Sequence, residues 1–221
     1  MADARDPWIK ICGLRDSHTA KAAVASGASA LGFMLAESRR RIEPASIAAI
    51  LSELSADRPP AVGVVVNESA EFIDRMVRET GIDIVQLAGD ESPEMLAEIE
   101  HTVWKALYFP AGTTLQEASR IIESWLDSTR PPAAMLIDAA VPGSYGGTGH
   151  KADWNLASRL AEKYPVVLAG GLTPLNVAEA IGSVRPVGVD VSSGVEVDGS
   201  KDPRLIQEFI AASLRAYALI G

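Results

Sequence analysis

Pro165-Val-Val-Leu-Ala-Gly-Gly171 and Val187-Gly-Val-Asp-Val-Ser-Ser-Gly194 are the most informative segments of this 221-residue chain. Each is an apolar run that ends in small residues, the pattern of a strand buried on both faces that gives way to a helix. Small residues let a ligand approach backbone N–H groups, and a following helix N-terminus favours an anion there. Because (β/α)8 barrels often build a phosphate site after their last two strands, the pair predicts such a barrel with a phosphate ester as its ligand.

Length and composition favour one (β/α)8 domain over residues 1–221, with residues 1–7 as a short N-terminal extension. The hydrophobic content of 48% argues against disorder, and no apolar run approaches a membrane span. The polar first residues carry no secretory signal, and a single cysteine, Cys12, cannot form an internal disulfide, so we expect a cytoplasmic protein. The formal net charge of −9 argues against nucleic acid or an anionic membrane as partner, and an anionic substrate would need local donors.

Apolar segments alternate with stretches of helical periodicity along the whole chain, which predicts parallel strands joined by helical crossovers. Capping residues support several of the helices, for example Asp16 before the first and Gly27 after it. The interval Pro110–Pro132 is compatible with one helix or with a ragged pair. The predicted strands are Trp8–Cys12, Ala30–Met34, Val62–Val66, Ile82–Leu87, Val103–Leu107, Ala134–Asp138, Val166–Ala169 and Val187–Val191.

The first predicted strand ends with two chemically useful side chains. Lys10 and Cys12 are two residues apart, so they share one side of the strand and, we expect, the barrel interior. A free thiol is mostly protonated at neutral pH, and a nearby ammonium would raise the thiolate fraction and make Cys12 a usable base. The alternative is that Cys12 is a small buried hydrophobe.

Two aspartates lie at or near the ends of later strands. A carboxylate such as Asp138 is costly to bury at the end of an apolar strand unless it has a partner or a task, so a structural hydrogen bond and proton transfer are both open. Asp190 shares a face with Ser192, which favours a role in orienting Lys10 or a strand end over direct chemistry.

Two loops at the expected catalytic end are also informative. Glu37–Ile42 contains three adjacent arginines, which form either a solvated loop or, through one guanidinium, a clamp for a carboxylate. Val141–Gly149 is rich in glycine and is either a mobile loop that closes over substrate or a simple connector; it lacks the Walker A pattern. The three histidines, His18, His101 and His150, are too far apart in sequence to suggest a metal site.

A series of short motifs runs in order from residue 8 to about residue 210 and resembles the phosphoribosylanthranilate isomerase family, (β/α)8 barrel enzymes of tryptophan biosynthesis. Any one motif is weak, but the ordered set is specific. The motifs are Lys10-Ile-Cys-Gly-Leu14, Leu31-Gly-Phe-Met34, Ser38-Arg-Arg-Arg-Ile42, Val62-Gly-Val-Val-Val-Asn67, Val85-Gln-Leu-Ala-Gly-Asp-Glu91, Leu136-Ile-Asp138, Gly146-Gly-Thr-Gly149, Asp153-Trp154, Leu168-Ala-Gly-Gly-Leu172, Asn176-Val177 and Val189-Asp-Val-Ser-Ser-Gly-Val-Glu196.

The resemblance implies an intramolecular oxidoreductase that converts N-(5-phosphoribosyl)anthranilate into 1-(2-carboxyphenylamino)-1-deoxyribulose 5-phosphate by an Amadori rearrangement, without metal or cofactor. It implies that Cys12 is the general base and Asp138 the general acid. It aligns Arg40 with the arginine that holds the anthranilate carboxylate, and we expect Lys10 and Asp190 beside it in the substrate site. By the same resemblance the phosphate would be bound by Gly170, Gly171, Ser193 and Gly194, and the loop closing over substrate would contain Gly146, Gly147, Thr148 and Gly149.

Three residues depart from the family pattern: Ala88 stands in place of a histidine, His150 in place of a lysine, and Ala152 in place of a common phenylalanine. These departures bear on loop motion and substrate affinity rather than on reaction type. Two alternatives remain. One is the related isomerase of histidine biosynthesis, which has aspartates on strands 1 and 5, where this chain has Cys12 and Lys105. The other is a barrel that only binds a sugar phosphate. The sequence is compatible with a monomer or a homodimer.

Overall fold

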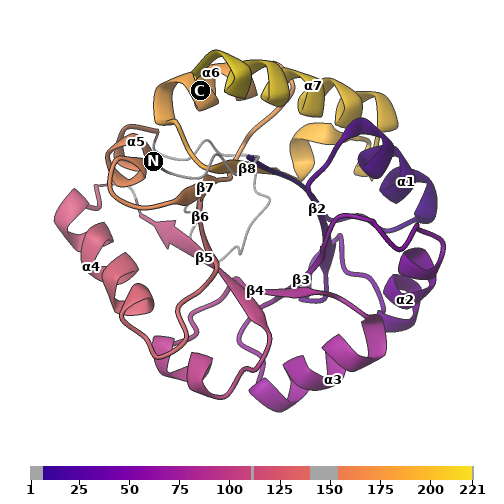
Figure 1. Ribbon diagram of the computed structural model, residues 1–221, viewed down its shortest axis with the longest axis horizontal. Coiled ribbons are helices and arrows are strands. Elements are labelled where there is room, and N and C mark those ends of the chain that lie inside the picture. The colour runs from indigo at the N-terminus through magenta and orange to yellow at the C-terminus, as the bar shows by residue number, and fades with distance from the viewer. Residues whose placement is uncertain (1–6, 111, 140–153, 221) are drawn as a thin grey trace.

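Eight parallel strands form a closed barrel in the computed structural model, which describes residues 7–110, 112–139 and 154–220 (Figure 1). Each strand pairs with the next along the chain, and β1 pairs with β8 to close the ring. This confirms the predicted fold class. The strands are β1 (Trp8–Cys12), β2 (Ala30–Met34), β3 (Ala61–Val65), β4 (Ile84–Leu87), β5 (Thr102–Phe109), β6 (Ala134–Ala139), β7 (Val166–Leu168) and β8 (Gly188–Val191).

Helices surround the barrel as an outer ring (Figure 1). The crossover between β4 and β5 contains only a short 3₁₀ helix, and a second 3₁₀ helix follows β8 directly. The bounds are α1 (Ser17–Ser26), α2 (Pro44–Ser52), α3 (Ala70–Thr80), η1 (Pro93–Ala97), α4 (Leu115–Leu126), α5 (Trp154–Ala161), α6 (Val177–Val184), η2 (Ser193–Val195) and α7 (Pro203–Ile220).

The helix ends follow the local capping chemistry. The carboxylate of Asp16 accepts a hydrogen bond from the Thr19 backbone N–H at the start of α1, and Gly27 ends that helix in the left-handed conformation with φ of 94°. The described part of the interval after β5 contains one helix, α4, which begins at a reciprocal capping box formed by Thr114 and Glu117. The caps of α1 and α4 therefore lie in the loops that follow the C-terminal ends of β1 and β5.

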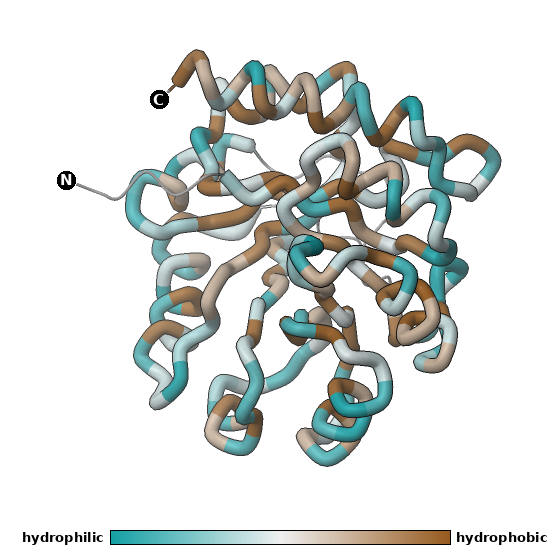
Figure 2. Tube along the Cα trace, turned by 45° about the vertical axis from the view of Figure 1, so that its right-hand side comes forward, coloured by the Kyte–Doolittle hydropathy of each residue, from teal (hydrophilic) through white to brown (hydrophobic). Residues whose placement is uncertain are grey.

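Two hydrophobic layers hold the barrel together. Side chains alternate along the strands: some point into the barrel, where Trp104 and Leu136 pack. The others point outward against the helices, where Phe33 of β2 joins the same cluster as Phe209 of α7. Figure 2 shows the hydrophobic residues concentrated along the strands, with hydrophilic residues common on the outer helices. The interior is thus a packed core, and only its C-terminal mouth is available for chemistry.

A short antiparallel hairpin follows η2 and was not predicted. Its strands are β9 (Glu196–Val197) and β10 (Ser200–Lys201), and both turn residues between them, Asp198 and Gly199, have positive φ. Asp-Gly is a known hairpin signal, but two-residue strands are too short to show alternation in a sequence. The hairpin matters because it brings Glu196 and Lys201 to the mouth of the barrel.

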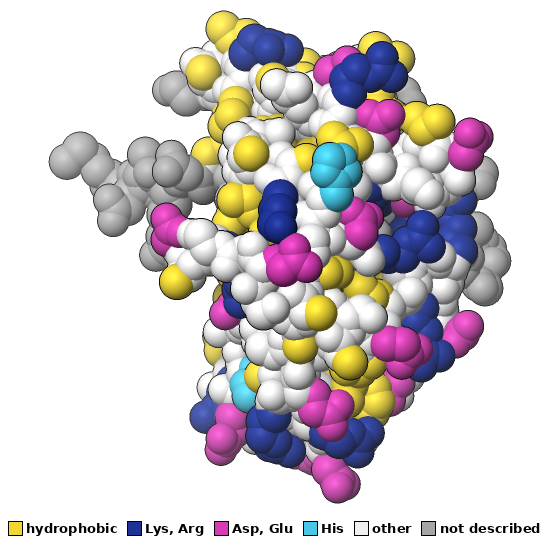
Figure 3. All heavy atoms as spheres, turned by 90° about the vertical axis from the view of Figure 1, so that its right-hand side faces the viewer, with side chains coloured by type: hydrophobic (Ala, Val, Ile, Leu, Met, Phe, Trp, Pro, Cys, Tyr) yellow, Lys and Arg dark blue, Asp and Glu magenta, His cyan; other side chains and the backbone are white. Residues whose placement is uncertain are grey.

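Charges are mixed over the outer surface. On the face that carries α1, α2 and α3, acidic and basic side chains are interspersed (Figure 3). No helix among the described residues is long and apolar enough to cross a membrane. The same residues contain no cluster of three or more histidine, cysteine, aspartate or glutamate side chains suited to a metal ion. Most of the expected N-terminal extension, residues 1–6, lies outside the described part.

Candidate active site

Lys10, Cys12 and Asp190 meet inside the barrel at the junction of β1, β2 and β8. Lys10 pairs in register with Asp190 across β1 and β8, and its Nζ donates a hydrogen bond of 3.0 Å to Asp190 Oδ1. Cys12 lies one step further along β1 and is 5% exposed. Gly32 on β2 makes room for both side chains, since a Cβ there would stand 2.9 Å from Cys12 Sγ and 3.0 Å from Lys10 Cε. A buried thiol and a buried ion pair thus share the floor of the mouth.

The electrostatic effect of this arrangement on Cys12 differs from the expectation that Lys10 favours the thiolate. Burial raises the pKa of the Cys12 thiol, and the nearby Lys10 ammonium lowers it without overcoming the effect of burial. Asp190 also raises the pKa of Cys12, because its carboxylate is close to the thiol as well as to Lys10. The pKa of Lys10 is itself raised: burial lowers it, but Asp190 and Cys12 outweigh that effect. The resting site therefore favours a charged lysine and a protonated thiol.

Asp138 lies next to the last residue of β6, where it is half-buried and lines the same small pocket as Asp190. It pairs in register with Tyr108 on β5, a residue that the sequence analysis did not single out. Burial raises the pKa of Tyr108, and the carboxylate of Asp138 adds to the shift, followed by Cys12 and Asp190. Tyr108 is thus a neutral phenol that lies close enough to Asp138, Cys12 and Asp190 for their charges to affect its pKa. Only the pairing of β5 with β6 places it there.

The predicted phosphate residues lie around a small pocket between the ends of β7 and β8. Gly170 and Gly171 line it from the loop after β7, with φ of 87° and 66°. Ser193, at the start of η2, lines it from the other side. Gly194 does not line the pocket. A Cβ at Gly194 would overlap the carbonyl oxygen of Leu172, so its role is to let η2 close against the loop after β7.

A further residue, Asn176, holds the loop after β7 in place. Its Oδ1 accepts a hydrogen bond of 2.8 Å from the Thr173 backbone N–H, and its Nδ2 donates one of 3.0 Å to the Gly171 carbonyl oxygen. Asn176 therefore fixes the two-glycine segment instead of capping α6 with its side chain. The Asn176-Val177 motif does not by itself predict this role, because the role depends on contacts within the folded loop.

One edge of the Arg40 guanidinium is already paired with a carboxylate. Its Nε and Nη2 donate hydrogen bonds of 2.6 and 3.0 Å to the two carboxylate oxygens of Glu196, and its side chain is 6% exposed. Arg39 and Arg41 are 59% and 48% exposed, so the run of three arginines contains one buried member and two surface members. The solvated-loop interpretation therefore describes Arg39 and Arg41 and does not describe Arg40.

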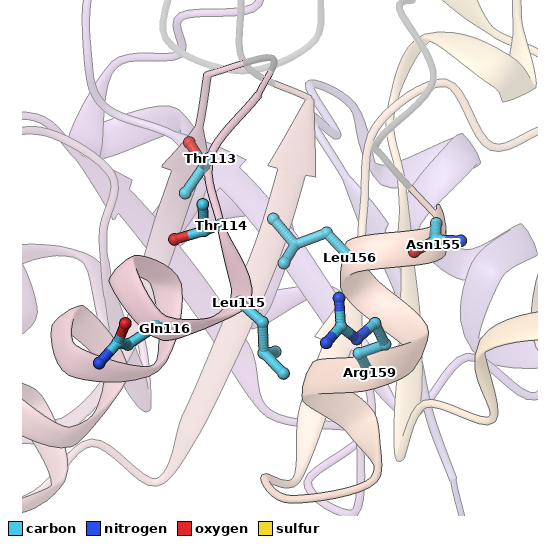
Figure 4. Close-up of a pocket in the computed structure, with 7 residues that line it drawn as sticks. All are labelled: Thr113, Thr114, Leu115, Gln116, Asn155, Leu156 and Arg159. Carbon is cyan, nitrogen blue, oxygen red and sulfur yellow. The ribbon is translucent and has the colours of Figure 1, made fainter.

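Other pockets of the described surface lie away from the mouth. One of about 340 Å³ lies between the starts of α4 and α5, where Arg159 is its charged residue (Figure 4). It contains no strand-end side chain, and it lies outside the barrel. Among the predicted site residues, Gly146, Gly147, Thr148 and Gly149 lie outside the described residues, as do His150 and Ala152. Ala88 is buried at the end of β4.

Comparison with known proteins gives a consistent result. The family described as N-(5'-phosphoribosyl)anthranilate (PRA) isomerase matches residues 9–212. The isomerase of that name from Roseiflexus sp. (strain RS-1) is 45% identical and that from Desulforudis audaxviator 42%, each alignment covering 94% of this chain and 98% of the relative. A crystal structure of the Thermotoga maritima enzyme superposes with a TM-score of 0.82 at 35% identity, covering 95% of this chain and 99% of that one. A structure of such an isomerase in complex with reduced 1-(o-carboxyphenylamino)-1-deoxyribulose 5-phosphate superposes at 0.79, with 33% identity and the same two coverages.

Proposed function

The chain belongs to the phosphoribosylanthranilate isomerase family, and from that premise we propose how its residues carry out the rearrangement of N-(5-phosphoribosyl)anthranilate in tryptophan biosynthesis. The observation that carries the proposal is the arrangement of Cys12 and Asp138 in one mouth with the glycine-lined pocket. A base, an acid and an anion site on one barrel rim suit an isomerisation of a sugar phosphate. We assign the enzyme to the cytoplasm, where thiols stay reduced.

Ring opening is the first step. A protonated carboxyl at Asp138 donates its proton to the furanose oxygen, the bond from that oxygen to C1 breaks, and the nitrogen lone pair forms a C1–N iminium. The carboxylate left on Asp138 lies on the same rim as the developing cation. Because the iminium withdraws electrons from C2, the neighbouring C–H becomes acidic without any external electron sink.

Proton abstraction is the second step. The Cys12 thiolate takes the proton from C2, the C–H electron pair forms the C1–C2 double bond, and the iminium electrons return to nitrogen to give an enolamine. The enolamine then loses its hydroxyl proton and gains a proton at C1, which leaves a ketone at C2. The Lys10 ammonium stabilises the thiolate while it exists, and Asp190 holds Lys10 at 3.0 Å.

Two binding regions at the mouth, the pocket after β7 and β8 and Arg40 after β2, orient the substrate. The phosphate binds to the backbone around Gly170, Gly171 and Ser193, where a short helix begins. The anthranilate carboxylate binds to Arg40 at the β2 side. The reacting carbons then lie between Cys12 and Asp138, which face the mouth from β1 and β6.

Genetic complementation tests the proposed function without purification. A tryptophan auxotroph that lacks this isomerase should grow without tryptophan when it expresses the chain, and should fail to grow with Cys12→Ser expressed to the same level. The related isomerase of histidine biosynthesis would instead restore a matching histidine auxotroph. That result, or no growth in either strain, would refute the assignment.

Replacement of Arg40 by lysine should raise KM by about tenfold or more, because a point charge cannot keep two parallel bonds to Glu196 and also serve a substrate carboxylate. Arg39→Lys and Arg41→Lys are matched controls on the same loop, and they should change KM by less than about twofold because these side chains are exposed. Steady-state kinetics decides the matter. Equal effects at all three positions would mean that the loop acts only through diffuse charge.

Replacement of Gly171 by valine should abolish competitive inhibition by inorganic phosphate, raising its Ki by about tenfold or more. The side chain would enter the anion site, and a β-branched residue is strained at φ of 66°. Gly81→Val is a matched control, because Gly81 also has positive φ, at 73°, but nothing lies near its missing side chain. Circular dichroism must show both variants folded. A Gly171→Val enzyme that keeps the wild-type Ki would place the anion site elsewhere.

A further inference from the structure

Glu196 is a buried carboxylate at the mouth that pairs with several cations. Its side chain is 5% exposed, and three cations contact it: Arg39 at 2.9 Å, Arg40 through two bonds, and Lys201 at 2.7 Å. Burial raises the pKa of Glu196, but hydrogen bonds from Arg40 and Lys201 outweigh burial and bring the pKa to about 2. Glu196 is therefore an anion at any working pH, and the cluster keeps two positive charges in excess.

The geometry leaves one edge of Arg40 available. A guanidinium has five N–H donors, and the pair with Glu196 uses the edge formed by Nε and Nη2. No acceptor for Nη1 is found among the residues that the structure describes. The edge formed by Nη1 and Nη2 has the spacing to bind a second carboxylate through paired bonds.

Arg40 is also held next to the thiol. Gly13 directly follows Cys12, and a Cβ at Gly13 would stand 2.6 Å from Arg40 Cδ, so the absence of a side chain there admits the arginine stem. Lys201 ties Glu196 to the same place: its Nζ donates a hydrogen bond of 2.9 Å to the Ser192 carbonyl oxygen, and Ser192 Oγ donates one of 3.1 Å to the Cys12 carbonyl oxygen. The hairpin after η2 is thereby connected to the end of β1.

We propose that Glu196 is a positioning residue, which fixes Arg40 by one edge so that the other edge receives the aromatic carboxylate of the substrate beside Cys12. This inference rests on the proposed function, because it deepens the part given to Arg40. A competing hypothesis is that Glu196 only neutralises the charge of Arg40, and it predicts the opposite result. If Glu196 only neutralised Arg40, its removal would strengthen carboxylate binding, because the cluster would become more positive.

The test compares two unreactive ligands, a reduced product analogue with the ring carboxylate and the same analogue with a plain phenyl ring. In the wild type the carboxylated ligand should bind at least about tenfold tighter, as expected for a charge-assisted pair. In Glu196→Gln that ratio should fall below about threefold, while the Kd of the phenyl ligand and the Ki of inorganic phosphate change by less than about twofold. Glu37→Gln, which removes one of the two exposed carboxylate partners of Arg41, should keep the wild-type ratio.

Glu196→Asp provides a second variant if the glutamine protein does not fold, since it keeps the charge but shortens the side chain by one methylene. The ratio of the two ligand affinities should fall in the same way in Glu196→Asp, because the substitution moves the carboxylate away from Arg40 without removing its charge. An unchanged or increased ratio in either variant would overturn the proposal, as would equal weakening of both ligands. Turnover by the wild type is measured separately, so a failure of the positioning role leaves a distinct result from a failure of the isomerase assignment.

Discussion

Cys12→Ser should lower kcat by about 10²-fold or more, because a hydroxyl is too weak a base near neutral pH to remove the C2 proton. The substitution preserves size, so the Kd of a reduced product analogue should stay within about twofold of the wild-type value. Single-turnover kinetics together with a ligand titration measures both quantities. A variant that keeps more than about a tenth of the wild-type kcat would show that another group is the base.

The pH profile gives a second measure of the same assignment. The thiolate is the active form, and burial raises the pKa of Cys12, so the ultraviolet absorbance of the thiolate should appear with a midpoint above the ordinary pKa of a thiol. The thiolate is titrated directly because kcat/KM also depends on the protonated carboxyl of Asp138, which is lost as the pH rises. This thiolate titration should be absent from Cys12→Ser. A midpoint below the ordinary thiol value would mean that Lys10 outweighs burial.

Asp138→Asn should also lower kcat by about 10²-fold or more, because an amide preserves shape and still hydrogen-bonds but has no acidic proton for the furanose oxygen. Binding of the reduced product analogue should change much less than kcat. Asp16→Asn is a matched control: Asp16 also lies near the end of a strand, but it caps α1, a task that asparagine performs as well. An Asp138→Asn enzyme with near wild-type kcat, or a loss equal to that in Asp16→Asn, would remove Asp138 from the chemistry.

Local patterns were sufficient for the barrel and for the strand ends. β1 and β2 have the predicted bounds, and the other strands differ by one or two residues at one or both ends, where pairing in the sheet decides the last residue. Lys10 and Cys12 share a face because they are two residues apart, a relation visible in any strand. The glycines after β7 likewise follow from the local sequence, since only small residues suit that turn.

Long-range contacts account for what the sequence did not predict. Arg40 and Glu196 are 156 positions apart, and only closure of the barrel with its extra hairpin brings them together. Tyr108 reaches Asp138 through the pairing of β5 with β6. The direction of the pKa shift at Cys12 was missed for a related reason: the neighbouring ammonium is apparent from spacing, but the burial that opposes it depends on the whole core.

Turnover of freshly prepared N-(5-phosphoribosyl)anthranilate by the purified protein distinguishes an isomerase from a barrel that only binds a sugar phosphate. The fluorescence of the anthranilate-type substrate should decay at a rate proportional to enzyme concentration, and mass spectrometry should find a product of unchanged mass with a ketone at C2. A decay no faster than that without enzyme, or release of free anthranilate in place of an isomer, would contradict the account.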